Sequence, residues 1–209
     1  MFYLGVDTGG TFTDFVLFDT TTRALRSFKV RSIPSDPAAA VQVGLRRLRD
    51  EFGVSPSAIE RMIFGTTVAT NAVLEQKGAK VALLTTRGMR DVLEIQRQWR
   101  RRLFDLYLEK PSPLASRRHR IEVGERVLAS GKALVPLTGE ELTRCVEEVK
   151  ALQVDAVAVC LLFSFLNPDH ERALGEALRA ALPDVPVTLS SDLTPEFREY
   201  ERTATTVMN

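Results

Sequence analysis

The chain has 209 residues, enough for one large domain or for one and a half small ones. Its formal net charge of +1 provides no global field that would favour nucleic acid or an anionic membrane as a partner. No apolar run approaches the about 20 residues that a transmembrane helix needs, and the first ten residues do not resemble a secretory signal. Cys145 and Cys160 fit no zinc or redox spacing, so a reducing cytoplasm is the expected compartment.

Three strands are predicted at the start of the chain. Phe2–Asp7 is a short apolar strand, and Gly9 and Gly10 interrupt it. Thr11–Asp19 follows as a strand with apolar residues on both faces, which predicts cover on both sides. A third strand over Leu25–Ile33 completes a predicted antiparallel meander.

Helices and strands then alternate. Asp36 and Pro37 are a typical start for a helix, and Gly53 ends it. The spacing next predicts, in order, a strand over 61–65, a helix over 66–77 and a strand over 80–86. After an irregular insertion over 87–120, we expect strands over 121–128, 156–163 and 185–189 and helices from Thr138, from Asn167 to Leu182 and from Thr194. This order predicts an α/β fold in which a mixed sheet begins with the antiparallel meander and is flanked by helices.

The strongest chemical signal is the turn between the first two strands. Without Cβ atoms at Gly9 and Gly10, a phosphate can approach the backbone closely, and the amides of the turn can point at it. Thr8 belongs to the same predicted binding loop, and Thr11 and Thr13 add hydroxyl donors. An ordinary Gly-Gly hairpin is the alternative. The combination of small, hydroxyl and acidic residues favours phosphate binding.

Asp7 stands at the end of the first strand, where its carboxylate is suited to a hydrated Mg²⁺ held partly by substrate phosphates. We expect Asp7, through water and Mg²⁺, and Thr11 to take part in catalysis.

A second phosphate or substrate region is predicted at Gly65, Thr66 and Thr67, where a strand gives way to a helix. Free amides at a helix start attract anions, whereas a threonine there can also simply cap the helix. The sequence leaves both open. Asn71 lies one turn further and within reach of the same region.

Asp7–Thr11 resembles the first phosphate motif of the actin, hexokinase and heat-shock ATPase superfamily. Phe64–Ala79 is similar to the signature of the hydantoinase A/5-oxoprolinase family, and Thr85–Ile95, Asn167–Glu171 and Arg198–Thr203 agree with it. The resemblance covers essentially the whole chain and implies an actin-like, ribonuclease H-like lobe that binds ATP and Mg²⁺.

The resemblance also implies a reaction, in which ATP is used to open a cyclic amide such as 5-oxoproline or a hydantoin. An acetone- or acetophenone-type carboxylase subunit is an alternative, and so is a truncated module without catalysis of its own. The expected partners are the small cyclic amide, a hydantoinase B-type subunit and a second copy of the chain. We expect a family N-terminal domain over 1–190 and, over 191–209, the start of a helix leading into a second lobe that is absent.

Two further groups of residues favour structural roles. His170 lies between Asp169 and Glu171 in the first turn of a helix, where neighbouring side chains diverge, so a metal site is not expected there. The arginine-rich stretch from Arg97 to Arg120 is interrupted by acidic residues and favours a solvated or subunit-facing surface.

Overall fold

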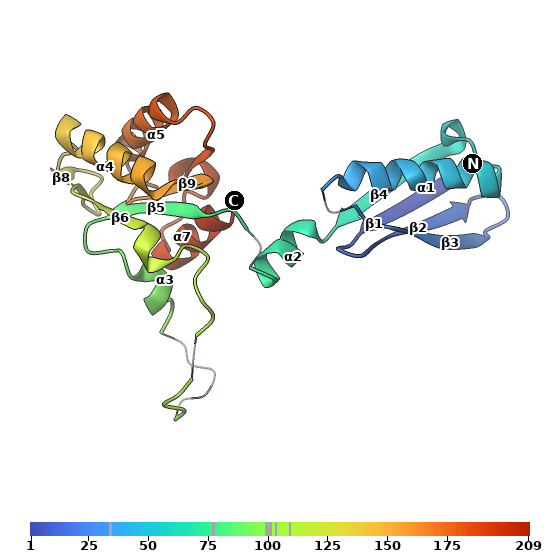
Figure 1. The fold of residues 1–209 in the computed structure, drawn as a ribbon, viewed down its shortest axis with the longest axis horizontal. Coiled ribbons are helices and arrows are strands. Elements are labelled where there is room, and N and C mark those ends of the chain that lie inside the picture. Colours follow the sequence, from blue (N-terminus) through green and yellow to red (C-terminus); the bar gives the residue numbers. More distant parts are fainter. Residues whose placement is uncertain (34, 77, 99–101, 103, 109) are drawn as a thin grey trace. The chain divides into compact units, whose positions relative to one another are not determined.

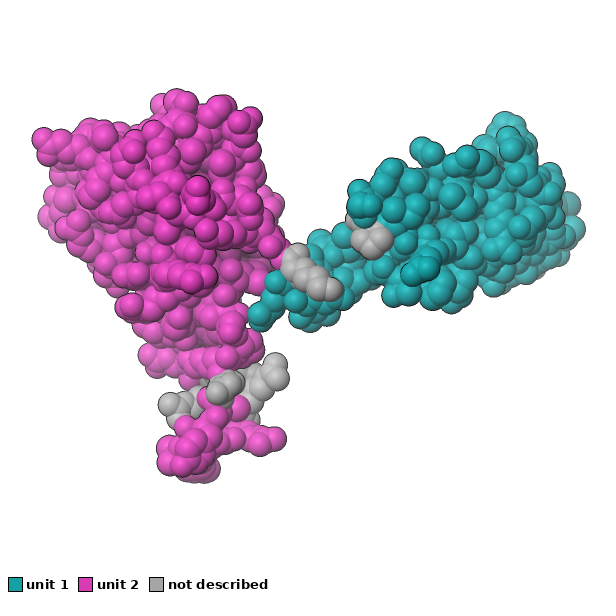
Figure 2. Space-filling model, in the orientation of Figure 1, with its two compact units in different colours: residues 1–77 teal, residues 78–209 magenta. Residues whose placement is uncertain are grey.

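The computed structural model describes residues 1–33, 35–76, 78–98, 102, 104–108 and 110–209. They form two compact units, residues 1–77 and residues 78–209 (Figures 1 and 2). Each unit has its own sheet and its own hydrophobic core. The α/β class predicted from the sequence is confirmed, but the strands divide between two main sheets.

Unit 1 contains a mixed sheet and two α-helices. Its elements are β1 (Phe2–Thr8), β2 (Phe12–Asp19), β3 (Leu25–Arg31), α1 (Pro37–Phe52), a short 3-10 helix (Pro56–Ala58), β4 (Ile59–Thr66) and α2 (Val68–Leu74). The strand order is β3-β2-β1-β4, in which β1 pairs antiparallel with β2 and parallel with β4. The predicted antiparallel meander is therefore present, and a parallel strand extends it.

Helix α1 covers one face of this sheet (Figure 1). The Asp36 carboxylate accepts a hydrogen bond from the Ala39 amide, Pro37 occupies the first turn, and Gly53 ends the helix in the left-handed region with φ of 67°. Apolar residues of the helix then pack on the alternate residues of β1 and β2 that face it. The prediction that the second strand is covered on both sides is wrong, because Phe12 and Val16 on its other face are 46% and 42% exposed. The core residues are Leu4, Val6, Phe15, Leu17, Val30, Ala40, Leu48 and Val54.

A glycine sets the closest approach of α1 to the sheet. A Cβ atom at Gly44 would lie 2.0 Å from Cζ of Phe15, whose ring is fully buried. The Phe15 ring in turn stacks on Phe28, with ring centroids 4.9 Å apart. The aromatic core of unit 1 therefore has room for a helix only if position 44 carries no side chain.

Strand β4 forms one edge of the sheet. It pairs with β1 on one side, and no other described strand pairs with it. Met62, Ile63 and Phe64 are 44%, 65% and 52% exposed. The edge of unit 1 is therefore apolar and open in this structure.

Unit 2 is built on a parallel sheet with the order β10-β9-β5-β6. Its strands are β5 (Val81–Thr86), β6 (Arg120–Val123), β9 (Ala156–Cys160) and β10 (Val187–Leu189), with a small antiparallel pair, β7 (Arg126–Val127) and β8 (Ala133–Val135). Its helices are α3 (Val92–Ile95), a short 3-10 helix (Arg117–His119), α4 (Gly139–Leu152), α5 (Asp169–Ala181), α6 (Ser190–Leu193) and α7 (Glu199–Met208).

Two core clusters of unit 2 involve β5 and β9, the two inner strands of the parallel sheet. One cluster includes buried residues of α4 and α5, and the other includes Val207 of α7. As predicted, Thr138 caps α4 by accepting from the Glu141 amide. No helix among the described residues combines the length and the apolar character that a bilayer span requires.

Several boundaries differ from those predicted. The strand predicted over 156–163 ends at Cys160, because the chain turns there and Phe163 has a φ of 58°. The last helix begins at Glu199 and not at Thr194, and the four-residue α6 precedes it. Residue 77, the last of the helix predicted over 66–77, lies outside the described residues, and α2 ends at Leu74. The domain boundary predicted at residue 190 stays a prediction.

The close approach at Gly44 gives a stability prediction. A Gly→Ala substitution in the interior of a helix normally raises the free energy of unfolding by up to about 1 kcal/mol. Here the added methyl group would overlap the Phe15 ring, and overpacking a core typically costs about 1–3 kcal/mol. We expect Gly44→Ala to lower the free energy of unfolding, measured by urea titration with circular dichroism. Gly139→Ala is the control because a Cβ there meets nothing within 4 Å. A Gly44→Ala variant more stable than the parent chain would contradict the packing described.

Candidate functional site

The turn between β1 and β2 is a tight hairpin. The Gly9 amide donates to the Phe12 carbonyl over 3.0 Å, and the ladder pairs Asp7 with Asp14 and Thr8 with Thr13. Gly10 and Thr11 are exposed at the tip. Neither Gly9 nor Gly10 has a φ in the left-handed region. The absence of Cβ atoms there is therefore explained by space and not by backbone strain.

Strand β4 brings the second predicted region to this turn. The parallel ladder places Gly65 beside Asp7 and Thr66 beside Thr8. A Cβ at Gly65 would lie 3.4 Å from Oδ1 of Asp7. The Thr8 carbonyl accepts the Thr67 amide at 3.0 Å. The two motifs, which are about 60 residues apart in the sequence, therefore form one cluster at the end of β1.

Asn71 and Thr67 lie over the glycines. A Cβ at Gly10 would be 3.3 Å from Nδ2 of Asn71, and a Cβ at Gly9 would be 4.0 Å from Oγ1 of Thr67. The Asn71 amide also donates to Thr67 Oγ1 at 3.4 Å. The sequence predicted Asn71 to lie within reach of Gly65–Thr67, and the structure places its side-chain amide beside Gly10 as well, where it adds a hydrogen-bond donor.

Thr13 faces the interior. Its side chain is fully buried, and its hydroxyl pairs with the Ser32 hydroxyl over 2.9 Å. The Ser32 amide donates to the Thr11 carbonyl at 3.0 Å. Thr13 therefore fastens the hairpin to the end of β3. Both hydroxyls were predicted to contact a phosphate. Thr11 is exposed at the tip of the hairpin, whereas the Thr13 hydroxyl is buried and bonded to Ser32.

Asp14 is a residue of this cluster that was not predicted from the sequence to belong to the site. Asp14 lies directly opposite Asp7 on the neighbouring strand, and like charges in that position are destabilising. Only the register of the hairpin reveals this pair. Lys29 lies 3.2 Å from Asp14 and partly balances it. Asp7 is exposed, so a cation bound there would relieve the repulsion.

The residues present fit a hydrated Mg²⁺ with phosphates. No group of three or more His, Cys, Asp or Glu residues suited to a metal occurs among the described residues, whereas Mg²⁺ commonly needs only one or two carboxylates beside phosphates and water. The glycine turn leaves space that a Cβ would fill. Thr8 Oγ1 is one of five buried side-chain atoms without a hydrogen-bond partner among the described residues, so its hydroxyl still has hydrogen-bonding capacity.

Helix α2 itself is a weak anion site. It has only seven residues, and its first amide, that of Val68, already donates to Thr66 Oγ1 at 3.3 Å. Thr67 occupies the cap position without a side-chain cap hydrogen bond. The importance of this region therefore comes from Gly65, Thr67 and Asn71 beside the glycine turn.

The side chains around His170 are bonded within the protein. His170 Nδ1 is 2.7 Å from Glu125 Oε2, and the Leu137 amide donates to Nε2 over 3.4 Å. Glu171 is fully buried and accepts from the amides of Leu161 and Ser191. These contacts support the structural role that the sequence favoured.

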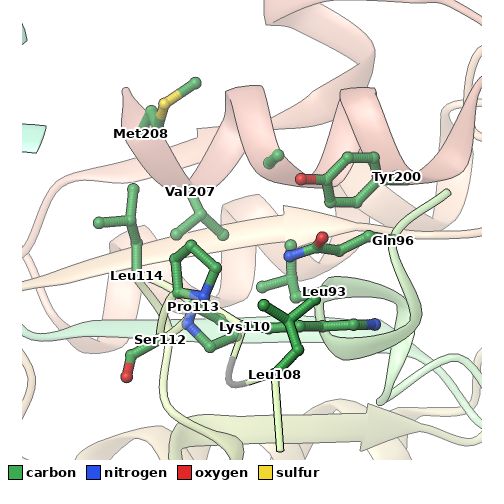
Figure 3. A pocket seen from close by; sticks show the side chains of 12 residues that line it. Leu93, Gln96, Leu108, Lys110, Ser112, Pro113, Leu114, Tyr200, Val207 and Met208 are labelled. Atoms are coloured by element: carbon green, nitrogen blue, oxygen red, sulfur yellow. The ribbon is translucent and has the colours of Figure 1, made fainter. Parts of the chain in front are cut away.

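A mostly apolar groove of unit 2 differs in character from the glycine turn. Side chains of α7 and of α3 face Leu108 and the segment 110–114 across about 840 Å³ (Figure 3). Its lining is mostly apolar, and the one charged side chain among the described residues that line it, Lys110, donates to the Glu94 carbonyl at 2.8 Å. The groove lacks the clustered backbone and hydroxyl donors that phosphate binding requires.

The fold and the two motifs define a known family. The sequence pattern of the hydantoinase/oxoprolinase N-terminal region matches residues 3–182, and the chain belongs to this family. Among its relatives, the caprolactamase subunit alpha of Pseudomonas jessenii is 38% identical over 212 residues, which cover 99% of this chain and 30% of that one. The 5-oxoprolinase 1 of Arabidopsis thaliana is 33% identical, over 98% of this chain and 18% of that one.

Solved structures agree in fold. The ATP-dependent caprolactamase from Pseudomonas jessenii superposes with a TM-score of 0.83, over 99% of this chain and 31% of that chain. A nucleotide-free acetone carboxylase, from a study of ATP-dependent acetone carboxylation, gives a TM-score of 0.86 at 25% identity, with the same coverage. The chain therefore spans less than a third of the length of these relatives.

The different environments of Thr13 and Thr11 give a second stability prediction. Thr13→Val would leave the Ser32 hydroxyl without its buried partner, at a cost of about 1–2 kcal/mol in unfolding free energy. Adding Ser32→Ala should recover much of that loss because no lone hydroxyl remains. Thr11→Val, at the exposed tip, should change stability by less than about 0.5 kcal/mol. Urea titration of the four proteins measures this. An equal loss for Thr11→Val and Thr13→Val would contradict the roles assigned.

Proposed function

We propose that this chain is the N-terminal, phosphate-binding part of an ATP-dependent enzyme that opens a cyclic amide, such as a lactam or a hydantoin. The observation that carries the proposal is the cluster at the end of β1, where Asp7, the Gly9-Gly10 turn and Asn71 meet. Its support is membership of the hydantoinase/oxoprolinase family, whose relatives include a caprolactamase and 5-oxoprolinases.

In this proposal each residue has a separate task. Gly9 and Gly10 admit the phosphate oxygens to the backbone, and the Thr11 hydroxyl and the Asn71 amide donate hydrogen bonds to them. Asp7 orients a hydrated Mg²⁺, which when bound neutralises charge on the phosphates during transfer. Gly65 keeps open the space beside the Asp7 carboxylate. The buried Thr13 holds the hairpin in position.

ATP would make the amide reactive. A lactam carbonyl is a poor electrophile, and transfer of the terminal phosphoryl group to its oxygen makes its carbon easier for water to attack. Phosphoryl transfer depends on positioning and charge neutralisation more than on covalent catalysis by the protein. A rigid hairpin end with small residues suits that task.

An ATP-dependent carboxylase is the second candidate function. It is favoured by the similarity to acetone carboxylase and to the acetophenone carboxylase gamma subunit of Aromatoleum aromaticum. Both candidates use the same phosphate site, so the substrate decides between them. ADP formation should be measured with lactams and hydantoins, and separately with ketones plus bicarbonate. Dependence on a cyclic amide supports the hydrolase, and dependence on ketone and bicarbonate supports the carboxylase.

We further propose that the enzyme works with a hydantoinase B-type subunit, since several relatives are themselves named as subunits. A cytoplasmic location agrees with Cys145 and Cys160, which are both free, buried thiols.

The role of Asp7 can be tested in the enzyme that contains this chain. Asp7→Asn removes the charge that would organise Mg²⁺ but keeps the shape of the side chain. We expect ATP-dependent turnover to fall about a hundredfold or more, with an unchanged circular dichroism spectrum. Asp50→Asn is the matched control because Asp50 is exposed and its carboxylate pairs with the neighbouring Arg49, far from the glycine turn in the sequence. Near-normal turnover by the Asp7→Asn variant would show that Asp7 does not take part in the reaction.

A side chain at Gly10 should interfere with phosphate approach. The nearest atom to a Cβ there is Nδ2 of Asn71 at 3.3 Å, and the backbone is not left-handed, so the fold tolerates the change. We expect Gly10→Val to weaken ATP binding at least about tenfold by calorimetry, with a melting temperature close to that of the parent. Gly78→Val is the control, since a Cβ there meets nothing within 4 Å. Unchanged ATP affinity in Gly10→Val would show that the turn is an ordinary hairpin and not a phosphate-binding loop.

A further inference from the structure

Unit 2 contains a cavity of about 550 Å³ with an excess of positive charge. It lies where β6, α4 and the turn after β5 meet, and five arginines line it: Arg87, Arg90, Arg118, Arg120 and Arg144. Its lining includes two carboxylates, Glu122 and Glu148. The whole chain has a formal net charge of only +1, so this local excess is not a consequence of a generally basic protein.

Two of the five guanidinium groups are held by carboxylates and form the rigid part of the wall. Arg144 lies 2.6 Å from Glu141 and also pairs with Glu148. The Arg144 guanidinium and the Gly124 amide lower the pKa of Glu141 to about 2, so this pair stays charged at neutral pH. Arg120 is buried, pairs with Glu94 and donates to the Ala115 carbonyl.

The other three arginines lack a close carboxylate among the described residues. Arg87 is 3.9 Å from Glu141, which Arg144 already engages, and its side chain is 67% exposed. Arg90 donates to a backbone oxygen, that of Arg117, at 2.9 Å. Arg118 is exposed and forms no ion pair with a described residue.

The remaining groups around the cavity do not cancel this charge. Glu122 accepts the Gly88 amide at 2.8 Å, so one of its oxygens is already engaged. The neighbouring His119 is buried, and burial, with Lys80 and Arg118, lowers its pKa, as expected in a positive local field. Ile121, Ala151 and Leu152 complete the wall with apolar surface.

We propose that this cavity binds a small oxyanion, of the phosphate-ester or dicarboxylate type, through Arg87, Arg90 and Arg118. Guanidinium groups bind such anions in bidentate fashion, and the paired Arg120 and Arg144 give the cavity a fixed wall. The volume is within the usual range for small-ligand sites. The site belongs wholly to unit 2, whereas the glycine turn belongs to unit 1, so it is a second anion site with its own residues.

The sequence alone did not identify this site. Arg118 and Arg120 belong to the arginine-rich stretch that was interpreted as a solvated or subunit-facing surface, and the cavity also takes Arg87, Arg90 and Arg144 from outside it. Arg100 and Arg101 of that stretch lie outside the described residues.

The test separates this site from the glycine turn. Inorganic phosphate and malonate are titrated into the 209-residue chain carrying Gly10→Val, with chemical shifts of the arginine side chains as the readout. We expect saturable binding of at least one anion. Arg118→Gln and Arg87→Gln should each weaken it about tenfold, as the loss of a charge-assisted hydrogen bond predicts. Arg172→Gln removes an exposed arginine from α5, outside the cavity, and should leave binding unchanged.

Each outcome decides for or against the site. Stronger binding of phosphate indicates a phosphate ester, and stronger binding of malonate indicates a dicarboxylate. Binding weakened equally by Arg172→Gln and Arg118→Gln would show general charge attraction and overturn the proposal. An acidic peptide that binds where neither phosphate nor malonate does would also overturn it, in favour of a protein interface. The proposal is also rejected if neither anion saturates the chain at 150 mM salt, about physiological ionic strength.

Discussion

The register between β1 and β4 is the constraint on which the candidate site depends. Because the parallel ladder pairs Asp7 with Gly65, the end of β1 meets the start of the Thr66-Thr67 segment, and α2 then places Asn71 over Gly10. A slip of one residue would turn every side chain of β4 to the opposite face and would move Gly65 away from Asp7. Both predicted regions therefore lie in one cluster only in this register.

The packing of α1 on the sheet stabilises this register. The core face of β1 presents Leu4 and Val6 to α1, and Gly44 lets the helix approach the Phe15 ring closely. The hydrogen bond between Thr13 and Ser32 fixes the other side of the hairpin. The glycine turn is thus an exposed loop on a tightly packed support, which is the usual way in which proteins position binding residues.

Much of this arrangement was predictable from the sequence, for identifiable reasons. Asp36, Pro37 and Gly53 mark the ends of α1. The buried face of β2 was not predictable in the same way, because β2 carries apolar residues on both faces and, of these, only Phe15 and Leu17 are buried. The division into two sheets was not predictable, since strand periodicity does not say which strands pair. For the same reason, the sequence did not show that Asp7 lies opposite Asp14 or that the Thr13 hydroxyl is buried. The first follows from the register of β1 and β2, and the second from the position of β3. The arginine cavity brings together residues from three separate segments, and only folding reveals it.

The open edge of β4 has a consequence for handling the protein. Its backbone groups face away from β1 beside Met62, Ile63 and Phe64, which are all exposed. An unpaired apolar strand of this kind is a template for strand addition, and natural proteins usually protect such edges with charges, proline or a covering element. Here Glu60 and Arg61 supply charges at one end only. At high concentration, the 209-residue chain is therefore expected to aggregate edge to edge through β4. A covering strand or a charged substitution at Ile63 would prevent this.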